Sequence, residues 1–428
     1  MILFKNATVS SGITKERKVD ILFDDKIIEL REDSIEAPNN CQVIDLDGKI
    51  VLPGCIDVHT HFRTDSPDWK SHFLNATKAA VSGGITFLAD SSCNVDEPLT
   101  ESFKVTDIYK EYEGNAVCDY GIWGFISSDD YSFYTEEIQE LSKAGVVGIE
   151  FYLYNKNFSP TPLDFDEILE LFTDFSNSQI LFGVFPMGFL SEKDDKKDIF
   201  DVQFDAVKKL FRRSQESEIH LFNVVSPKIV DFIMNSTKKY HCSYDINPNI
   251  FKKNDRSIFI PGSQIHDDES TFTTLIQTGK VPSVSTNSGY ISEDLNYTRE
   301  DLTNIVNYGD LQHMIPFFMS YYYLAKRLTL GNLERMLAGN PAKILGIEHI
   351  KGNFSKESDA DFIVIDPSKT YRVQDEQSSF YDEEINCQIV QTYIRGHRVF
   401  DIDEGIEENR QFGKLVKRSF QATTLNYY

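Results

Sequence analysis

Short apolar segments of β-type composition alternate with helical segments through most of the chain. Eight of them follow one another, namely CIDVHTHF (55–62), ITFLAD (85–90), DYGIWGFI (119–126), VVGIEFYL (146–153), ILFGVF (180–185), IHLFNVV (219–225), HCSYDI (241–246) and PSVSTN (282–287). Apolar strands separated by helices are typical of a parallel sheet that is covered on its outer face. Eight such units predict a (β/α)8 barrel of the TIM type.

The intervening segments have the spacing of amphipathic helices. In SHFLNATKAAVSGG, Phe73, Ala76 and Ala80 fall on one face, and the pair Gly83-Gly84 indicates the helix end. The segment DVQFDAVKKLFRR repeats this pattern with Phe204, Val207, Leu210 and Phe211. We expect these helices to cover the outside of the barrel.

Both ends of the chain have a β-type pattern without a helical period. Short β runs such as 2–9 fill the first part, and DADFIVIDP (359–367) and IVQTYIRGHRVF (389–400) follow the last helix. One small domain built from both ends explains this arrangement most economically. We therefore predict an α/β protein in three parts: a β-sandwich-like domain formed by 1–52 and 351–405, a barrel over 53–350, and a C-terminal tail over 406–428.

The charge balance and the apolar runs exclude several functions. The chain has 67 acidic and 43 basic residues and a formal net charge of -24, which argues against a nucleic-acid surface because phosphate contacts need clustered Lys and Arg. No apolar run approaches the roughly 18 residues of a transmembrane helix. The opening MILFKNATVS lacks the basic region of a signal peptide. The six cysteines form no close pair, which predicts reduced thiols in a cytoplasmic protein without a membrane role.

The stretch PGCIDVHTHFR (53–63) places two histidines at the end of the first barrel strand. Alternate residues of a strand point to the same side, so His59 and His61 project together, with Asp57 deeper on that face. At the carboxyl end of a barrel strand, both imidazoles face the mouth, where barrel active sites lie. The pair is either half of a Zn2+ site or two hydrogen-bonded core histidines.

This stretch resembles the signature of the amidohydrolase superfamily, in its cyclic amidase branch of dihydroorotases, allantoinases and hydantoinases. The likeness covers nearly the whole chain, since NPAKILGI (340–347) is similar to the end of the family's barrel, and DADFIVIDP and TYIRGHRVF are similar to its C-terminal β half. The arginine directly after HTHF points to dihydroorotases. The resemblance implies that Arg63 and Asn94 bind the carboxylate of dihydroorotate, for which a guanidinium fork is suited. The alternatives are a rim ion pair for Arg63 and a turn cap for Asn94.

The resemblance also implies a two-metal centre, of which this chain lacks several parts. Where the family carries a bridging carboxylated lysine or a shorter acid, the fourth strand has Glu150, which either ligates a cation or pairs with a histidine. The fifth strand has no histidine, and Asn223 stands where the family has the histidine of the sixth strand. His220 lies three residues before Asn223, so we expect it on the opposite face, against the helix layer or at the rim.

The catalytic aspartate that follows the eighth strand in the family is replaced by Asn287, in the run Thr286-Asn287-Ser288. An amide cannot accept and return a proton near neutral pH, and loss of a positioned acid–base group typically removes about 10²–10⁴-fold in rate. A substrate-binding segment of dihydroorotases corresponds here to IPGSQ (260–264), which keeps only Pro261 of the family's pattern.

Three functions remain open from the sequence. The first, which we favour, is a dihydroorotase-like homologue that is inactive or very weak and has a structural or regulatory role. The second is an active dihydroorotase or other cyclic amidase, which hydrolyses a ring C–N bond with an atypical, mononuclear metal site built from His59, His61 and Glu150. The third is a binding module for a dihydroorotate-like acid. The expected cofactor is thus one Zn2+ ion or none, and the partners that the resemblance implies are a second copy of the chain and aspartate carbamoyltransferase.

Overall fold

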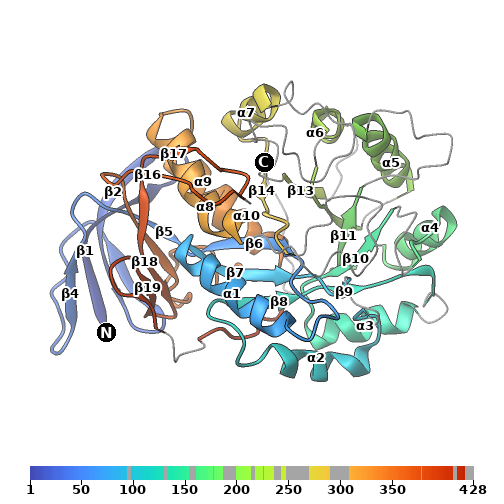
Figure 1. Cartoon of the computed structure of the whole chain (residues 1–428), viewed down its shortest axis with the longest axis horizontal. Coiled ribbons are helices and arrows are strands. Elements are labelled where there is room, and N and C mark those ends of the chain that lie inside the picture. Colours follow the sequence, from blue (N-terminus) through green and yellow to red (C-terminus); the bar gives the residue numbers. More distant parts are fainter. Residues whose placement is uncertain are drawn as a thin grey trace.

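The protein was analysed as a computed structural model. It describes residues 1–93, 98–129, 134–153, 161–176, 178–186, 199–213, 217–224, 226–235, 242–246, 269–289, 308–376, 378–407 and 412–419. A sheet built from the two ends of the chain lies beside a barrel of parallel strands and helices (Figure 1). Among the described residues, no helix is long and apolar enough to cross a membrane.

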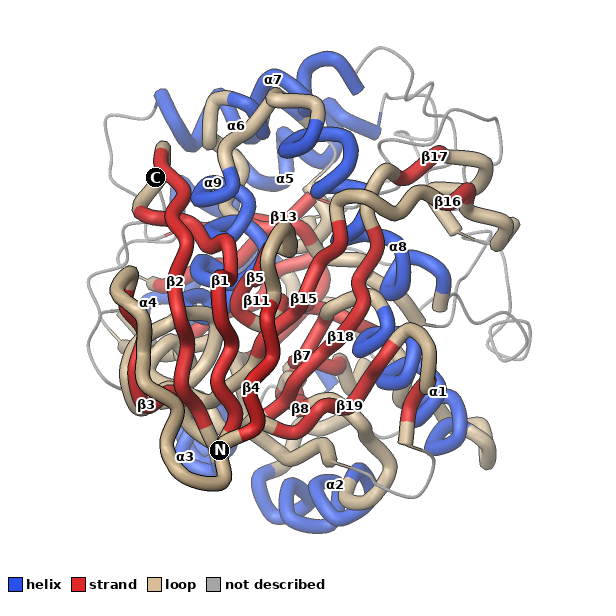
Figure 2. The backbone as a smooth tube through the Cα atoms, turned by 90° about the vertical axis from the view of Figure 1, so that its left-hand side faces the viewer, coloured by secondary structure: helices blue, strands red, loops and turns tan. Residues whose placement is uncertain are grey.

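The sheet beside the barrel joins strands from both ends of the chain. Its order is β20-β19-β18-β15-β5-β1-β2-β3, with β4 paired to β1, and Figure 2 shows these strands running side by side. The link is the antiparallel pair of β5 and β15, in which Leu52 lies opposite Ile363. The bounds are β1 Ile2–Ser11, β2 Lys15–Phe23, β3 Ile27–Arg31, β4 Gln42–Asp45, β5 Ile50–Pro53, β15 Phe362–Asp366, β18 Gln388–Ile394, β19 His397–Asp401 and β20 Gly405–Ile406.

Aromatic side chains form the core of this sheet. Phe4 and Phe23 make an edge-to-face contact with ring centroids 4.7 Å apart, and Phe362 and Tyr393 pack against both rings. These four residues come from β1, β2, β15 and β18. The first and last parts of the chain therefore share one core, as the pattern of their β runs predicted.

The barrel strands run in chain order around a closed ring. Hydrogen bonds link them as β6-β7-β8 and as β9-β10-β11-β12-β13-β14, with β8 and β9 separated only by Trp123. The ring closes where the backbone N–H of His61 donates to the carbonyl of Ser288 at 2.7 Å. The bounds are β6 Cys55–Thr60, β7 Ile85–Asp90, β8 Asp119–Ile122, β9 Gly124–Phe125, β10 Ile149–Tyr152, β11 Leu181–Phe185, β12 Glu218–Leu221, β13 Cys242–Ile246 and β14 Ser283–Val284. The predicted barrel is confirmed.

Close backbone contact at this closure requires a glycine. Gly289 bridges to His61 in parallel fashion, with a φ of 148°. A Cβ atom at this position would lie 2.3 Å from the carbonyl oxygen of His61. The first and eighth strands can therefore approach each other only because residue 289 has no side chain.

Helices surround the strands on the outside (Figure 1). The first, α1 Trp69–Ser82, ends at Gly83-Gly84 as predicted, and Gly84 has a φ of 89°. The others are α2 Val105–Tyr112, α3 Tyr134–Ala144, α4 Phe165–Asp174, α5 Ile199–Arg213, α6 Pro227–Asn235, α7 Glu269–Gln277, α8 Gly309–Phe318, α9 Leu330–Glu334 and α10 Asn340–Ile344. A small hairpin of β16 Tyr371–Arg372 and β17 Glu384–Ile385 follows later in the chain.

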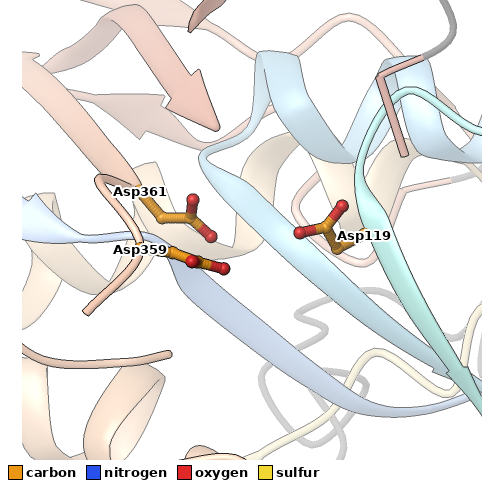
Figure 3. A group of neighbouring side chains, drawn as sticks. All are labelled: Asp119, Asp359 and Asp361. Carbon is orange, nitrogen blue, oxygen red and sulfur yellow. The ribbon is translucent and has the colours of Figure 1, made fainter. Parts of the chain in front are cut away.

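A buried ion cluster joins the barrel to the terminal sheet. Asp119 begins β8, while Asp359 and Asp361 immediately precede β15; their carboxylates converge in Figure 3. A metal ion could be expected among three such acids, but the ammonium of Lys351 lies 2.5 Å from Asp119 and 2.7 Å from each of the other two. Arg395 also pairs with Asp119. Protein cations therefore already balance the charge of this cluster.

The described part of the C-terminal tail, 412–419, packs across the amino end of the barrel. Tyr120 of β8 donates its backbone N–H to Lys414 and accepts one from Val416, which continues the strand ladder. The guanidinium of Arg418 pairs with both carboxylate oxygens of Glu218, at 3.2 and 3.1 Å, and donates to the carbonyl of Ile344 at 2.7 Å. The tail thus covers the end of the barrel opposite to the histidine pair.

Candidate active site

The histidine pair lies at the carboxyl end of β6 and faces the end of β14. The rings of His59 and His61 are in edge contact, with centroids 4.4 Å apart. Asn287, which follows β14, holds them together: its Oδ1 lies 3.0 Å from Nδ1 of His59 and 3.0 Å from Nε2 of His61. Deeper in the barrel, Asp57 of β6 also links the first strand to the end of the eighth, because it accepts hydrogen bonds from the hydroxyls of Ser285 and Thr286.

Glu150 of β10 reaches the same pair from across the barrel. Its Oε2 lies 3.0 Å from Nε2 of His59, and its Oε1 accepts a hydrogen bond from the hydroxyl of Ser91. Burial raises the pKa of Glu150 to about 7 and lowers the pKa of His59 to about 4 and that of His61 to about 3. Both imidazoles are therefore neutral near pH 7.

The proton positions follow from this geometry. An amide oxygen only accepts hydrogen bonds, so Nδ1 of His59 and Nε2 of His61 carry the protons that point to Asn287. A neutral imidazole has one N–H, so Nε2 of His59 is an acceptor. The carboxyl group of Glu150 must then donate to it in its protonated form, which agrees with the raised pKa of Glu150.

Below the pair, the interior of the barrel holds a second buried histidine. The Nδ1 atom of His220 lies 2.8 Å from the hydroxyl of Ser243, and its Nε2 atom lies 2.9 Å from Asp245 Oδ2. Its ring contacts Phe222, and Phe222 in turn stacks on His59. The prediction that His220 faces the helix layer or the rim was wrong. Because Phe222 points inward, the residue two positions before it on the same strand points inward as well.

Asn223 stands at the carboxyl end of the sixth barrel strand, as the sequence predicted. Its backbone N–H donates to Asp245 Oδ1 at 2.9 Å, and its carbonyl accepts from Gln203 at 3.3 Å. Its side-chain Oδ1 is buried and has no hydrogen-bond partner in the described ranges. Both Asn223 and Asn287 have a left-handed backbone, with φ of 52° and 50°, a conformation that asparagine tolerates better than most residues.

Arg63 leaves the first strand at the mouth and keeps unused donors. Asp90 at the end of β7 accepts the backbone N–H of Arg63 at 3.2 Å and that of Phe62 at 2.9 Å, which fixes the course of the chain here. The guanidinium pairs with Glu111 through Nη2 at 3.5 Å, while Nε and Nη1 are buried and have no partner among the residues described. Asn94, the other predicted carboxylate ligand, lies outside the described residues, as does the segment 260–264.

The comparisons with known proteins agree with this architecture. Residues 50–162 match the amidohydrolase family model. The chain is 26% identical to a dihydroorotase of Geobacter metallireducens, over 85% of this chain and 88% of that protein. It is 22% identical to a D-phenylhydantoinase of Escherichia coli, over 93% of this chain and 94% of that protein.

This chain contains an amidohydrolase family domain, and it is similar to dihydroorotases and hydantoinases over most of its length.

Solved structures show that this chain shares its fold with hydantoinases. The L-hydantoinase (dihydropyrimidinase) from Arthrobacter aurescens superposes with a TM-score of 0.81 at 19% identity, over 97% of this chain and 99% of that chain. A D-hydantoinase from Thermus sp. gives a TM-score of 0.78 at 18% identity, over 98% and 99% of the two chains. These likenesses establish the barrel and its companion sheet.

The residues that the structure describes do not fit a two-metal centre. Among the described residues, the only group of three acidic, histidine or cysteine ligands with converging atoms is the Asp119 cluster, which Lys351 fills. At the mouth, His59 and Glu150 present two donor atoms 3.0 Å apart, but Nε2 of His61 is turned to Asn287. The fifth strand, β11, ends without a histidine, and Asn223 offers an amide in place of an imidazole.

Three residues of the site were not singled out from the sequence. Cys93 places its sulfur 3.6 Å from Nδ1 of His61 and 2.9 Å from the hydroxyl of Tyr152, and Phe222 covers one face of His59. Burial raises the pKa of the Cys93 thiol, so it is a protonated packing group and a poor nucleophile. In the sequence, the only sign that Cys93 belongs to the site was its position just after the second barrel strand.

Proposed function

We propose that this chain is a dihydroorotase-like amidohydrolase homologue that binds a small cyclic acid at the barrel mouth and hydrolyses it very slowly or not at all. The observation that carries the proposal is the contact of Asn287 with both imidazoles. The resemblance assigns this position to the residue that takes a proton from the attacking water. A carboxamide cannot do so.

The second support is the shortage of metal ligands. Metal ions activate water in such reactions by lowering its pKa toward ~7. Here the converging donors are one imidazole and one carboxyl group, His59 and Glu150. Without both a bound ion and a base, a ring amide would meet only ordinary water, and turnover would fall by at least the roughly 10²–10⁴-fold that a positioned base supplies.

Ligand binding by the mouth is supported by Arg63. Leaving a buried donor unpaired costs about 1–3 kcal/mol, and two atoms of Arg63, Nε and Nη1, have no partner within the described part of the chain. A carboxylate satisfies guanidinium donors in the geometry they prefer. We therefore propose a dihydroorotate-like acid as the ligand, and a structural or regulatory role, either as a homodimer or as a partner of aspartate carbamoyltransferase.

The alternative is an active cyclic amidase with a single ion. It is favoured by one observation, the 3.0 Å separation of His59 Nε2 and Glu150 Oε2, which suits two ligands of one metal. This alternative predicts turnover that depends on added metal and is lost in Glu150→Gln.

The test combines turnover with binding. Purified protein with excess Zn2+ or Mn2+ is assayed in both directions of the dihydroorotate ring-opening reaction, and we expect no measurable turnover. A rate of about 1–10³ s⁻¹, the usual enzyme range, would overturn the proposal. Calorimetry with dihydroorotate and orotate should show binding that Arg63→Ala abolishes. Arg372→Ala, an exposed arginine on β16, is the matched control and should bind normally.

A further inference from the structure

We infer that the carboxamide of Asn287 replaces a metal ion at this mouth: it holds the two imidazoles together and offers its own N–H groups to the ligand. The inference rests on the proposed function for the ligand, a planar acid with ring carbonyl groups. Beyond the proposed function, it identifies the Asn287 carboxamide as the group that binds such a ligand where a metal ion would otherwise do so.

The first argument is the position of Asn287 Oδ1. This one oxygen lies 3.0 Å from a nitrogen of each ring, so it occupies the point between the imidazoles where a shared ion would have to sit. Both nitrogens carry protons directed at it, because an amide oxygen has only lone pairs to offer. A nitrogen that donates a proton has no lone pair for a metal. The hydrogen-bonded pair and a metal-bound pair therefore exclude each other at these atoms.

The second argument is the other end of the same planar group. The Nδ2 atom of Asn287 points away from both rings when Oδ1 points toward them, and it has no hydrogen-bond partner among the residues that the structure describes. Asn287 is half-buried, unlike the fully buried His59. Its two N–H groups are thus accessible donors beside the imidazole pair.

The third argument is the support around Asn287. Its backbone is in the left-handed region, at a φ of 50°, and its backbone N–H is 3.4 Å from the hydroxyl of Ser285. Ser285 is itself bound to Asp57 and to the carbonyl of His59. The carboxamide is therefore fixed from the first strand as well as from the eighth, and it is preorganised for a ligand.

Together, these groups give a mouth that recognises oxygen atoms by N–H donors. Arg63 supplies donors for a carboxylate, and Asn287 Nδ2 supplies donors for a ring carbonyl. A metal ion would polarise such a carbonyl toward attack, whereas a neutral amide binds it with a hydrogen bond of ordinary strength. The site can then bind the acid without opening its ring.

The experiment follows metal binding and acid binding in three proteins. The wild type, Asn287→Asp and Asn287→Ala are dialysed with Zn2+ or Co2+, and metal is counted by elemental analysis and by Co2+ absorption. We expect no bound ion in the wild type or in Asn287→Ala. We expect about one ion per chain in Asn287→Asp, because a carboxylate beside Nδ1 of His59 and Nε2 of His61 gives three donors on one side of the imidazole pair and leaves one position open.

Binding of orotate to the metal-free proteins provides the second readout. Asn287→Ala should weaken it roughly five- to tenfold, the value of one hydrogen bond, while wild-type binding should be unchanged by a chelator. Stoichiometric Zn2+ in the wild type that disappears in His59→Gln would overturn the inference, as would equal orotate binding by Asn287→Ala and wild type. If orotate does not bind to any of the proteins, the proposed ligand fails, and the metal counts alone decide the role of Asn287.

Discussion

The imidazole of His59 lies flat on the ring of Phe222, with centroids 3.7 Å apart and planes 4° from parallel. The contact joins the first barrel strand to the end of the sixth. It leaves only the two in-plane nitrogens of His59 for polar contacts, and Asn287 and Glu150 take one each. One face and both nitrogens of this imidazole are therefore held by other parts of the protein.

Removing this stack should destabilise the barrel. Phe222 is buried and also makes an edge contact with Trp123, so Phe222→Ala should lower the free energy of unfolding by about 3–5 kcal/mol, measured by urea denaturation. Phe103, which is 71% exposed, provides the control. Its change to alanine should stay within about 0.5 kcal/mol. Equal effects of the two substitutions would contradict the packing role.

The carboxyl group of Asp90 should make stability depend on pH. Burial raises the pKa of Asp90 from 3.8 to about 6. Hydrogen bonds oppose this rise only in part; they come from Phe62, Tyr112, Thr60 and Arg63. A raised pKa in the folded state means that the folded protein binds a proton that the unfolded chain has already lost. The stabilisation is therefore complete below pH 3.8 and is lost as the pH rises through about 6.

The advantage of the wild type over Asp90→Asn should thus shrink by about 1 kcal/mol between pH 5 and pH 8, as followed by urea denaturation at both pH values. Asp47→Asn, at an exposed position where a Lys18 hydrogen bond lowers the pKa, should show no such change in this interval. A difference that grows with pH would refute the assignment.

Lys351 is expected to be essential for joining the barrel to the terminal sheet. Its side chain is 1% exposed among Asp119, Asp359 and Asp361. Lys351→Met would leave these acids buried without their central cation, which should cost about 3–5 kcal/mol in denaturation experiments. Lys18, whose pair with Asp47 is exposed to solvent, is the matched control, and Lys18→Met should change little. A mild effect at Lys351 would mean that Arg395, paired with Asp119, and Lys26, paired with Asp359, balance the acids without it.

The C-terminal segment should contribute to stability through Arg418. Its guanidinium is buried against Glu218 and the carbonyl of Ile344. Arg418→Ala should cost about 3 kcal/mol, because it removes the two-point pair between the guanidinium and Glu218 in a largely buried site. Lys414, whose side chain is exposed, is the control, and Lys414→Ala should have no comparable effect. Faster proteolysis after residue 411 in Arg418→Ala alone would provide independent support.

The sequence by itself determined the architecture and the position of the site. Short apolar segments of β-type composition that alternate with amphipathic helices leave few alternatives to a parallel barrel. The spacing of His59 and His61 brings both imidazoles to one side of one strand, because residues i and i+2 share a face. Glu150, Asn223 and Asn287 were located through the family resemblance, which assigns each of them to a ligand or acid–base position of the barrel strands.

Only the tertiary structure decided what these side chains do to one another. No spacing along the chain relates Asn287 to His59 or His61, which are 228 and 226 residues away. His220 was misplaced because its face was counted back from Asn223, which lies beyond the end of β12 and has a left-handed backbone, so that strand alternation does not extend to it. The contacts of Phe222 with His59 and His220 place His220 inside the barrel. The contacts of the site are set by barrel closure between β6 and β14, and closure is a property of the folded ring as a whole.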